Sequence, residues 1–180
     1  MKDALNVPNV LTYIRIALVP IFVVLFFTTN LYYALAIFVL ACLTDVIDGF
    51  IARKFNMVTN LGKILDPFAD KLLKLSTLIC FVSVNIIPLW FLIVMLSLDL
   101  FLLVSGAIIL KRGIIIKANW FGKLGTLFIS LGVLLCFFYE YLKNWNLYIL
   151  YFGLAIVFMA CISYTVTFFI EKNKLKNNKE

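Results

Sequence analysis

Four aspartates are the residues in this sequence best suited to carry chemistry, and they fall within 26 positions of one another. They are Asp45, Asp48, Asp66 and Asp70. The first two are three residues apart and the last two are four apart, and both spacings place a pair of side chains on one face of a helix. Two helices can therefore present two carboxylates each toward a common site.

These carboxylates need positive partners, because the segments around them are strongly apolar. An ionised carboxylate near the centre of a bilayer costs about 2.5–3.5 kcal/mol, and four close together would also repel one another. Mg²⁺ or Mn²⁺ is the obvious countercharge, because both ions prefer hard oxygen ligands. Four carboxylates on two helices could hold two ions, and such a pair stabilises the attacking and leaving oxygens in phosphoryl transfer.

Small and basic residues accompany the acids. Gly49 and Ala52 share the first helix and Gly62 opens the second, so the helices can approach closely or leave room for a ligand. Arg53 is placed to bind phosphate oxygens. The chain contains no histidine, which excludes Ser-His and Cys-His catalysis and His-based zinc sites. A non-enzymatic, carboxylate-lined ion pathway, or acids paired with Arg and Lys for packing alone, remain the alternatives.

The elements that must position these groups are long apolar segments. Hydrophobic residues make up 64% of the 180 residues and charged residues 14%, against about 45–50% and about 25% in a soluble domain. A membrane-spanning helix needs about 20 apolar residues, and six stretches reach that length: 10–29, 31–53, 64–87, 88–110, 120–141 and 146–170. We predict an all-α integral membrane protein with six transmembrane helices in one domain (1–180), with a short N-terminal interfacial segment over 2–9.

The basic residues predict the orientation. Of the 16 Lys and Arg residues, only Lys143 falls in the first, third or fifth connection between the expected helices. The positive-inside rule then places both termini and the carboxylate site on the cytoplasmic side of a cell inner membrane. Because the basic residues lie at the ends of apolar segments and form no stripe, the net charge of +7 does not indicate nucleic-acid binding.

The arrangement of these residues resembles the signature of the CDP-alcohol phosphatidyltransferases at every defined position. The signature reads Asp45-x-x-Asp48-Gly49-x-x-Ala52-Arg53, eight residues, then Gly62-x-x-x-Asp66-x-x-x-Asp70. Within that family the chain is most similar to the bacterial phosphatidylglycerophosphate and cardiolipin synthase branch. The supporting segments are Pro8-Asn9-x-x-Thr12-x-x-Arg15, Gly62-Lys63-x-x-Asp66-Pro67-x-Ala69-Asp70-Lys71 and Gly122-Lys123-x-x-Thr126. The resemblance covers essentially the whole chain.

The resemblance implies a role for each residue. Asp45, Asp48 and Asp66 would hold two divalent ions on the diphosphate of CDP-diacylglycerol. Asp70 would complete the second metal site and act as the general base on the hydroxyl of an alcohol acceptor, which attacks the lipid-linked phosphorus and releases CMP. The implied substrate-binding residues are Asn9, Gly49, Ala52, Arg53, Thr59, Gly62 and Lys123. The resemblance also implies a homodimer.

The acceptor alcohol is less well defined than the donor. Relatives that use glycerol 3-phosphate carry Arg-Glu early in the fourth span and a second Arg eight residues later, where this chain has Leu98-Asp99 and Gly106. We expect a phosphatidylglycerophosphate synthase first, since this is the commonest role in the branch. Phosphatidylglycerol carries one negative charge and needs fewer basic partners, so cardiolipin synthase is the alternative, followed by transfer to serine or inositol phosphate.

Three basic residues near the acids have open roles. Lys74 is expected to extend toward the membrane interface, and Lys71 to act on Asp70 or reach a phosphate. Arg15 either faces the same cavity as the acids or pairs with one of them.

Overall fold

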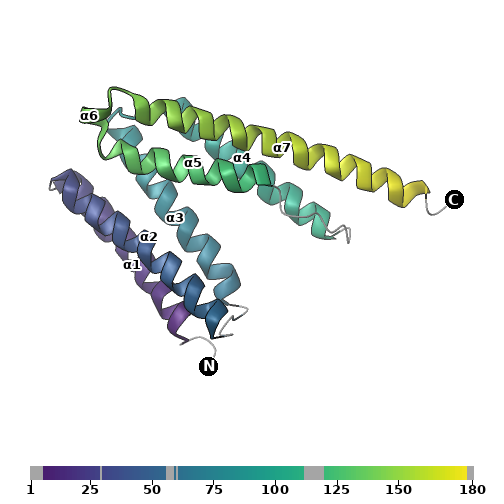
Figure 1. Cartoon of the computed structure of the whole chain (residues 1–180), viewed down its shortest axis with the longest axis horizontal. Helices are drawn as coiled ribbons and strands as arrows, with labels where there is room; N and C mark the ends of the chain where they lie inside the picture. The colour runs from purple at the N-terminus through teal and green to yellow at the C-terminus, as the bar shows by residue number, and fades with distance from the viewer. Residues whose placement is uncertain (1–5, 29, 56–58, 60, 112–119, 178–180) are drawn as a thin grey trace. The chain divides into compact units, whose positions relative to one another are not determined.

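The computed structural model describes residues 6–28, 30–55, 59, 61–111 and 120–177. Throughout this part of the chain the regular structure is helical (Figure 1). The helices are α1 (Val7–Thr28), α2 (Leu31–Lys54), α3 (Gly62–Ser83), α4 (Leu89–Lys111), α5 (Trp120–Cys136), α6 (Tyr139–Leu142) and α7 (Trp145–Asn177). The prediction of an all-α protein is therefore confirmed.

Several of these helices are long and apolar enough to cross a membrane. Among the described residues, four segments meet that description: Val7–Thr28, Leu31–Ala52, Leu89–Gly106 and Trp145–Phe168. α3 is long enough but carries charged side chains in its first half, and α5 has 17 residues. The chain is a multi-pass membrane protein by these criteria, while the count of six spans stays a prediction.

The N-terminal interfacial segment was expected over 2–9. Residues 1–5 lie outside the described part of the chain, and from Val7 onward the residues already belong to α1. Pro8 lies in the first turn of α1, where its missing N–H leaves no helical hydrogen bond unmade.

The chain divides into two compact units, Met1–Val84 and Asn85–Glu180. In the first unit, α1 packs along both α2 and α3, whereas α2 and α3 make few contacts with each other. At one end of this unit, buried aromatic rings join the helices. The ring of Phe22 lies 6.3 Å from that of Phe38, and the ring of Phe26 lies 5.2 Å from that of Phe81 (centroid distances).

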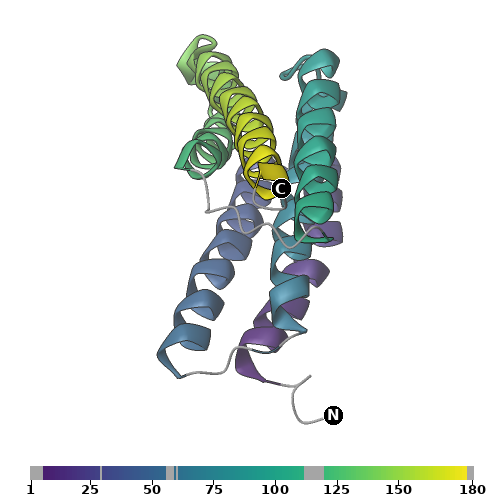
Figure 2. The same ribbon diagram turned by 90° about the vertical axis from the view of Figure 1, so that its right-hand side faces the viewer.

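In the second unit, α5 and α7 lie side by side (Figures 1 and 2). Glycine makes this close approach possible at three positions, Gly125, Gly132 and Gly153. A Cβ at Gly125 would lie 3.0 Å from the backbone nitrogen of Val157, and one at Gly132 would lie 3.1 Å from that of Leu150. Small residues at such positions let helices pack backbone to backbone in a membrane.

The remaining contacts of the second unit involve a turn and an aromatic stack. Between α5 and α7 the chain passes through α6 and then turns at Lys143 and Asn144, which have φ angles of 40° and 72°. α4 packs on α7, where the ring of Trp90 stacks on that of Tyr151 at 5.3 Å.

Candidate active site

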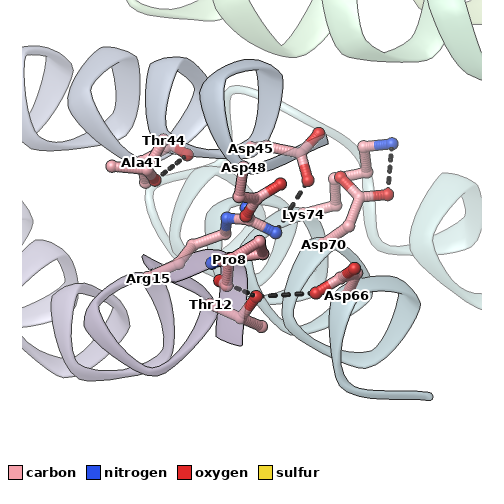
Figure 3. Close-up of polar contacts among 10 residues, drawn as sticks. All are labelled: Pro8, Thr12, Arg15, Ala41, Thr44, Asp45, Asp48, Asp66, Asp70 and Lys74. Atoms are coloured by element: carbon pink, nitrogen blue, oxygen red, sulfur yellow. Dashed lines mark hydrogen bonds and ion pairs between the residues drawn. The ribbon is translucent and has the colours of Figure 1, made fainter. Parts of the chain in front are cut away.

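The four aspartates come from two helices of the first unit, as the spacing predicted. Asp45 and Asp48 project from the second half of α2, and Asp66 and Asp70 from the first half of α3. Figure 3 shows the two pairs facing a common region, with side chains of α1 between them. In each of the two helices that carry the aspartates, the buried phenylalanine of the aromatic end lies in the opposite half from the acids. The carboxylate site and the aromatic rings therefore lie at opposite ends of the unit.

Arg15 of α1 bridges the two acids of α2. Its Nη1 lies 2.7 Å from Oδ1 of Asp45, and its Nη2 donates a hydrogen bond to Oδ2 of Asp48 (Figure 3). The side chains of Arg15 and Asp48 are 1% and 3% exposed, whereas that of Asp45 is 46% exposed. Of the two expectations for Arg15, the structure therefore shows pairing with aspartates, and it shows this pairing inside the carboxylate site.

Thr12, one turn earlier on α1, contacts Asp66 of α3. Its hydroxyl lies 2.6 Å from Oδ1 of Asp66 and 3.1 Å from the backbone oxygen of Pro8. A hydroxyl has a single proton to donate, and the shorter contact to a carboxylate is the stronger hydrogen bond. Thr12 therefore fixes the orientation of Asp66.

Lys74 pairs with Asp70 on α3. Its Nζ lies 3.0 Å from Oδ2 of Asp70, four residues earlier in the helix. The side chain of Lys74 thus reaches back along α3 toward Asp70, and its extension toward the membrane interface stays a prediction. The two side chains are 29% and 40% exposed, so this pair is far more open to its surroundings than that of Arg15 with Asp48.

A second polar group joins the start of α1 to the start of α3. The hydroxyl of Thr59 donates to Oδ1 of Asn9 at 3.1 Å and accepts from the backbone N–H of Gly62 at 2.9 Å. A Cβ on Gly62 would lie 2.8 Å from that same oxygen of Asn9, so a larger residue there would push the Asn9 side chain aside. Three residues predicted to bind substrate are thus brought together, and the start of α3 is held against α1.

The other predicted substrate-binding residues belong to α2 and α5. Gly49 and Ala52 are partly buried positions of α2, and Arg53 lies in the last turn of that helix. Lys123 belongs to α5 in the second unit, where it is exposed and its Nζ lies 5.8 Å from the centre of the Trp120 ring. The sequence also offers Lys111, Arg112, Lys117 and Lys123 for an acceptor phosphate, and of these Arg112 and Lys117 lie outside the described residues.

The donor set fits a hard divalent cation in its chemistry, since it offers four carboxylates and no softer ligand. Among the described residues, however, no three acids lie close enough together to coordinate one ion jointly. The two pairs are on helices that make few mutual contacts, and Arg15 and Lys74 supply positive charge to them. A divalent ion bound here would share these carboxylates with the two basic side chains.

Thr12 had no predicted role, although its spacing from two other polar residues of the same helix pointed to one. Asn9, Thr12 and Arg15 recur at three-residue spacing along an apolar helix, and all three are at most 1% exposed. Buried polar side chains at helical spacing indicate partners on neighbouring helices.

Comparison of the sequence with protein families gives the class of this protein. Residues 5–167 match the family model for CDP-alcohol phosphatidyltransferases. The chain therefore belongs to the CDP-alcohol phosphatidyltransferase family and is an enzyme of that class. Members of the family generally use a divalent metal ion.

Individual relatives are similar over about two thirds of the chain. A Bacillus subtilis protein named CDP-diacylglycerol–glycerol-3-phosphate 3-phosphatidyltransferase is 36% identical over 136 residues, which are 67% of this chain and 70% of that protein. A Mycobacterium tuberculosis protein named probable phosphatidylglycerophosphate synthase is 37% identical over 127 residues, 67% of this chain and 60% of its own length. A Streptomyces coelicolor cardiolipin synthase (CMP-forming) is 36% identical over 129 residues, 68% of this chain and 60% of that protein.

Proposed function

We propose that this protein is a phosphatidylglycerophosphate synthase, which transfers the phosphatidyl group of CDP-diacylglycerol to glycerol 3-phosphate and releases CMP. The observation that carries the proposal is the pair of aspartate-bearing helices facing one another in a chain of this family. The names of the Bacillus subtilis and Mycobacterium tuberculosis relatives support the choice of acceptor.

In this proposal, Asp45, Asp48, Asp66 and Asp70 hold two Mg²⁺ or Mn²⁺ ions. Bound there, the ions would neutralise the diphosphate and stabilise the charge that develops during transfer. Thr12 orients Asp66 toward the site through its 2.6 Å hydrogen bond. Asn9, Thr59 and Gly62 form the polar group nearest the start of α3, and we assign them, with Gly49, Ala52 and Arg53, to the cytidine diphosphate.

Asp70 is proposed as the general base. Its side chain is 40% exposed, so an acceptor hydroxyl can reach the carboxylate and give up its proton there. The proton leaves the hydroxyl for the carboxylate of Asp70 as the hydroxyl oxygen bonds to the phosphorus of the phosphatidyl group. The bond from that phosphorus to the oxygen of CMP then breaks.

The apolar helices and the basic residues support a membrane topology for the enzyme. We propose six membrane spans in one functional domain, with both termini and the aspartates on the cytoplasmic side of the inner membrane. Lys123 is assigned to substrate binding from the second unit. A homodimer is the proposed oligomeric state.

Cardiolipin synthesis is the second candidate, and one sequence feature favours it. Leu98 and Gly106 stand where arginines would bind the dianionic phosphate of glycerol 3-phosphate. The similarity to the Streptomyces coelicolor cardiolipin synthase is of the same size as that to the other relatives. A phosphatidylglycerol acceptor needs less positive charge and would tolerate these residues.

A transfer assay tests both candidates. The purified protein is incubated with CDP-diacylglycerol and Mg²⁺, and with either glycerol 3-phosphate or phosphatidylglycerol, and the lipid product is identified by mass spectrometry. We expect CMP release with glycerol 3-phosphate. Product formed only from phosphatidylglycerol would assign the chain to cardiolipin synthesis, and no CMP release with either alcohol would refute the proposed activity.

Asp70→Asn tests the proposed base. Because removal of a general base typically lowers the rate about 10²–10⁴-fold, we expect CMP release to fall by at least that order, with the thermal unfolding of the protein little changed. Phe68→Leu, an exposed position two residues earlier on α3, serves as the control and should keep the wild-type rate. If Asp70→Asn still releases CMP at the wild-type rate, another group removes the proton.

A further inference from the structure

Arg15 is the most deeply buried charged side chain among the described residues, and both of its acidic partners are proposed metal ligands. The residue is 0% exposed, and its charged contacts among the described residues are with Asp45 and Asp48. A buried guanidinium without a counter-ion is strongly destabilising. The buried charge of Arg15 is therefore stabilised by the same two carboxylates that a divalent ion would use.

The two contacts of Arg15 differ in quality. With Asp48 the guanidinium makes both an ion pair and a hydrogen bond, and both side chains are buried. With Asp45 the nitrogen and oxygen are 2.7 Å apart, but Nη1 makes no hydrogen bond of acceptable geometry, and the Asp45 side chain is 46% exposed. Asp45 is thus the more loosely held of the two acids and the more accessible one.

The guanidinium is also incompletely paired. Nε of Arg15 is buried and has no hydrogen-bond partner among the described residues. An arginine that satisfied all of its donors on Asp45 and Asp48 would be difficult to displace. In the observed contacts, Nε and Nη1 of Arg15 make no hydrogen bond. Releasing one carboxylate therefore costs the guanidinium fewer hydrogen bonds than it would if all of its donors were paired.

We infer that Arg15 is a resident cation of the Asp45–Asp48 pair: it neutralises these acids in the metal-free protein and competes with the divalent ion for them. This inference rests on the proposed metal site and adds to it a residue that lowers metal affinity. A divalent ion at this site would be held by Asp45, the acid less firmly bound to Arg15, and would lie near the positive charge of the guanidinium.

If Arg15 competes with the metal, its removal should raise the affinity of the protein for the ion. A residue that only orients metal ligands strengthens metal binding, so its removal weakens the affinity. A residue that competes with the metal weakens binding, so its removal strengthens the affinity. Charges about 4 Å apart near a protein surface interact strongly enough that removing one should change an ion's affinity by about tenfold or more.

The test is a Mn²⁺ titration of the purified full-length protein in detergent, with free Mn²⁺ measured by electron paramagnetic resonance. For Arg15→Met we expect a dissociation constant lower than wild type by about tenfold or more. The melting temperature should fall in EDTA, because two acids lose their partner, and should recover toward the wild-type value in saturating Mn²⁺. Arg15→Lys keeps the charge but can reach one carboxylate at a time, so its affinity should lie between the two.

Lys54→Met is the matched control for lost positive charge. Lys54 lies at the end of α2 with its Nζ over the rings of Phe50 and Phe55, and it pairs with no aspartate in the part of the chain that the structure describes. Its removal should leave Mn²⁺ affinity unchanged. An equal gain in affinity in Lys54→Met would show that net charge alone matters and would overturn the inference.

The remaining outcomes separate this inference from the proposed function. If wild type binds Mn²⁺ and Arg15→Met binds it equally or more weakly, Arg15 is not a competitor, and the proposed metal site stands without it. If Arg15→Met does not fold, the same comparison is made with Arg15→Lys, where an unchanged or weaker affinity refutes the competition. If wild type binds no Mn²⁺, the metal site itself fails and the inference fails with it.

Discussion

In the first unit, aromatic rings join the helices at one end and charged side chains join them at the other, whereas in the second unit α5 and α7 meet along three glycines. The glycine contacts bring two backbones together, as at Gly125 against Val157 and Gly132 against Leu150. In the first unit, the side chains of Arg15 and Thr12 connect α1 to acids on α2 and α3, and α2 and α3 themselves make few contacts. The same apolar surroundings thus hold a closely packed pair and a more open polar site.

This difference indicates where each unit can carry chemistry. Backbone packing along α5 and α7 leaves no room for a ligand between those two helices. At the polar end of the first unit, α1 supplies side chains that span the distance between α2 and α3, so groups that bind a substrate can lie between the helices. The aromatic end must then hold the three helices together, and the predictions below test that division.

The largest effect on stability is expected for Phe22→Ala. The ring of Phe22 is fully buried, and it contacts Phe26 within α1 and Phe38 across the helix pair. Such a truncation costs about 3–5 kcal/mol in a water-soluble core. In lipid part of the transfer term is absent, because the surroundings are themselves apolar, so we expect a loss of about 3 kcal/mol in the free energy of unfolding.

Phe27→Ala is the control for Phe22→Ala on the same helix. Its ring is 57% exposed and should cost little to remove. Unfolding of the purified proteins in mixed detergent and SDS micelles compares the two. Equal losses would mean that the aromatic end does not hold the first unit together, and that the polar contacts do.

An intermediate effect is expected for Gly125→Ala in the second unit. The new Cβ would lie 2.6 Å from Cγ2 and 3.0 Å from the backbone nitrogen of Val157, so α5 and α7 must separate. Overpacking of this kind costs about 1–3 kcal/mol. Gly122→Ala adds the same methyl group to the same helix where nothing lies within 4 Å. It should be neutral or slightly stabilising, because alanine is the better helix former.

The same unfolding assay distinguishes these glycine variants. A loss of stability in Gly125→Ala, without one in Gly122→Ala, would support close backbone packing as the basis of the α5–α7 pair. If both substitutions are neutral, the two helices can separate at little cost, and the contrast between the units disappears.

Much of the fold could be predicted from the sequence, because long apolar segments have few alternatives to a helix in a membrane. The expected segment 31–53 corresponds to α2 (Leu31–Lys54) almost residue for residue. The expected segment 120–141 was less accurate, since α5 ends at Cys136 and the separate turn of α6 follows. No glycine or proline marks that break, so apolar composition alone could not locate it.

The site was predictable in part, and the limits follow from sequence distance. Spacing along one helix placed Asp45 with Asp48 and Asp66 with Asp70, and it could also have paired Asp70 with Lys74 at i, i+4. The contacts of Thr12 with Asp66 and of Arg15 with Asp48 join residues 54 and 33 positions apart. Which buried polar side chain of α1 meets which acid depends on how the helices pack, and no local pattern encodes that.

The smallest effect is expected for Thr12→Val, which tests the polar end of the first unit. Valine keeps the shape of the buried side chain but cannot donate the 2.6 Å hydrogen bond to Oδ1 of Asp66. Asp66 is partly exposed, so water or a bound cation can replace the lost donor, and the net cost should be about 1 kcal/mol.

Thr28→Val is the matched control, because the hydroxyl of Thr28 is exposed and bonds only the backbone oxygen of Val24 in its own helix. The loss in the free energy of unfolding should be smaller for Thr28→Val than for Thr12→Val in the same unfolding assay. Since a divalent ion would hold Asp66 in place of the hydroxyl, the difference between the two variants should shrink when Mg²⁺ is added. A difference that does not respond to Mg²⁺ would mean that Thr12 joins α1 to α3 and does not prepare Asp66 for a metal.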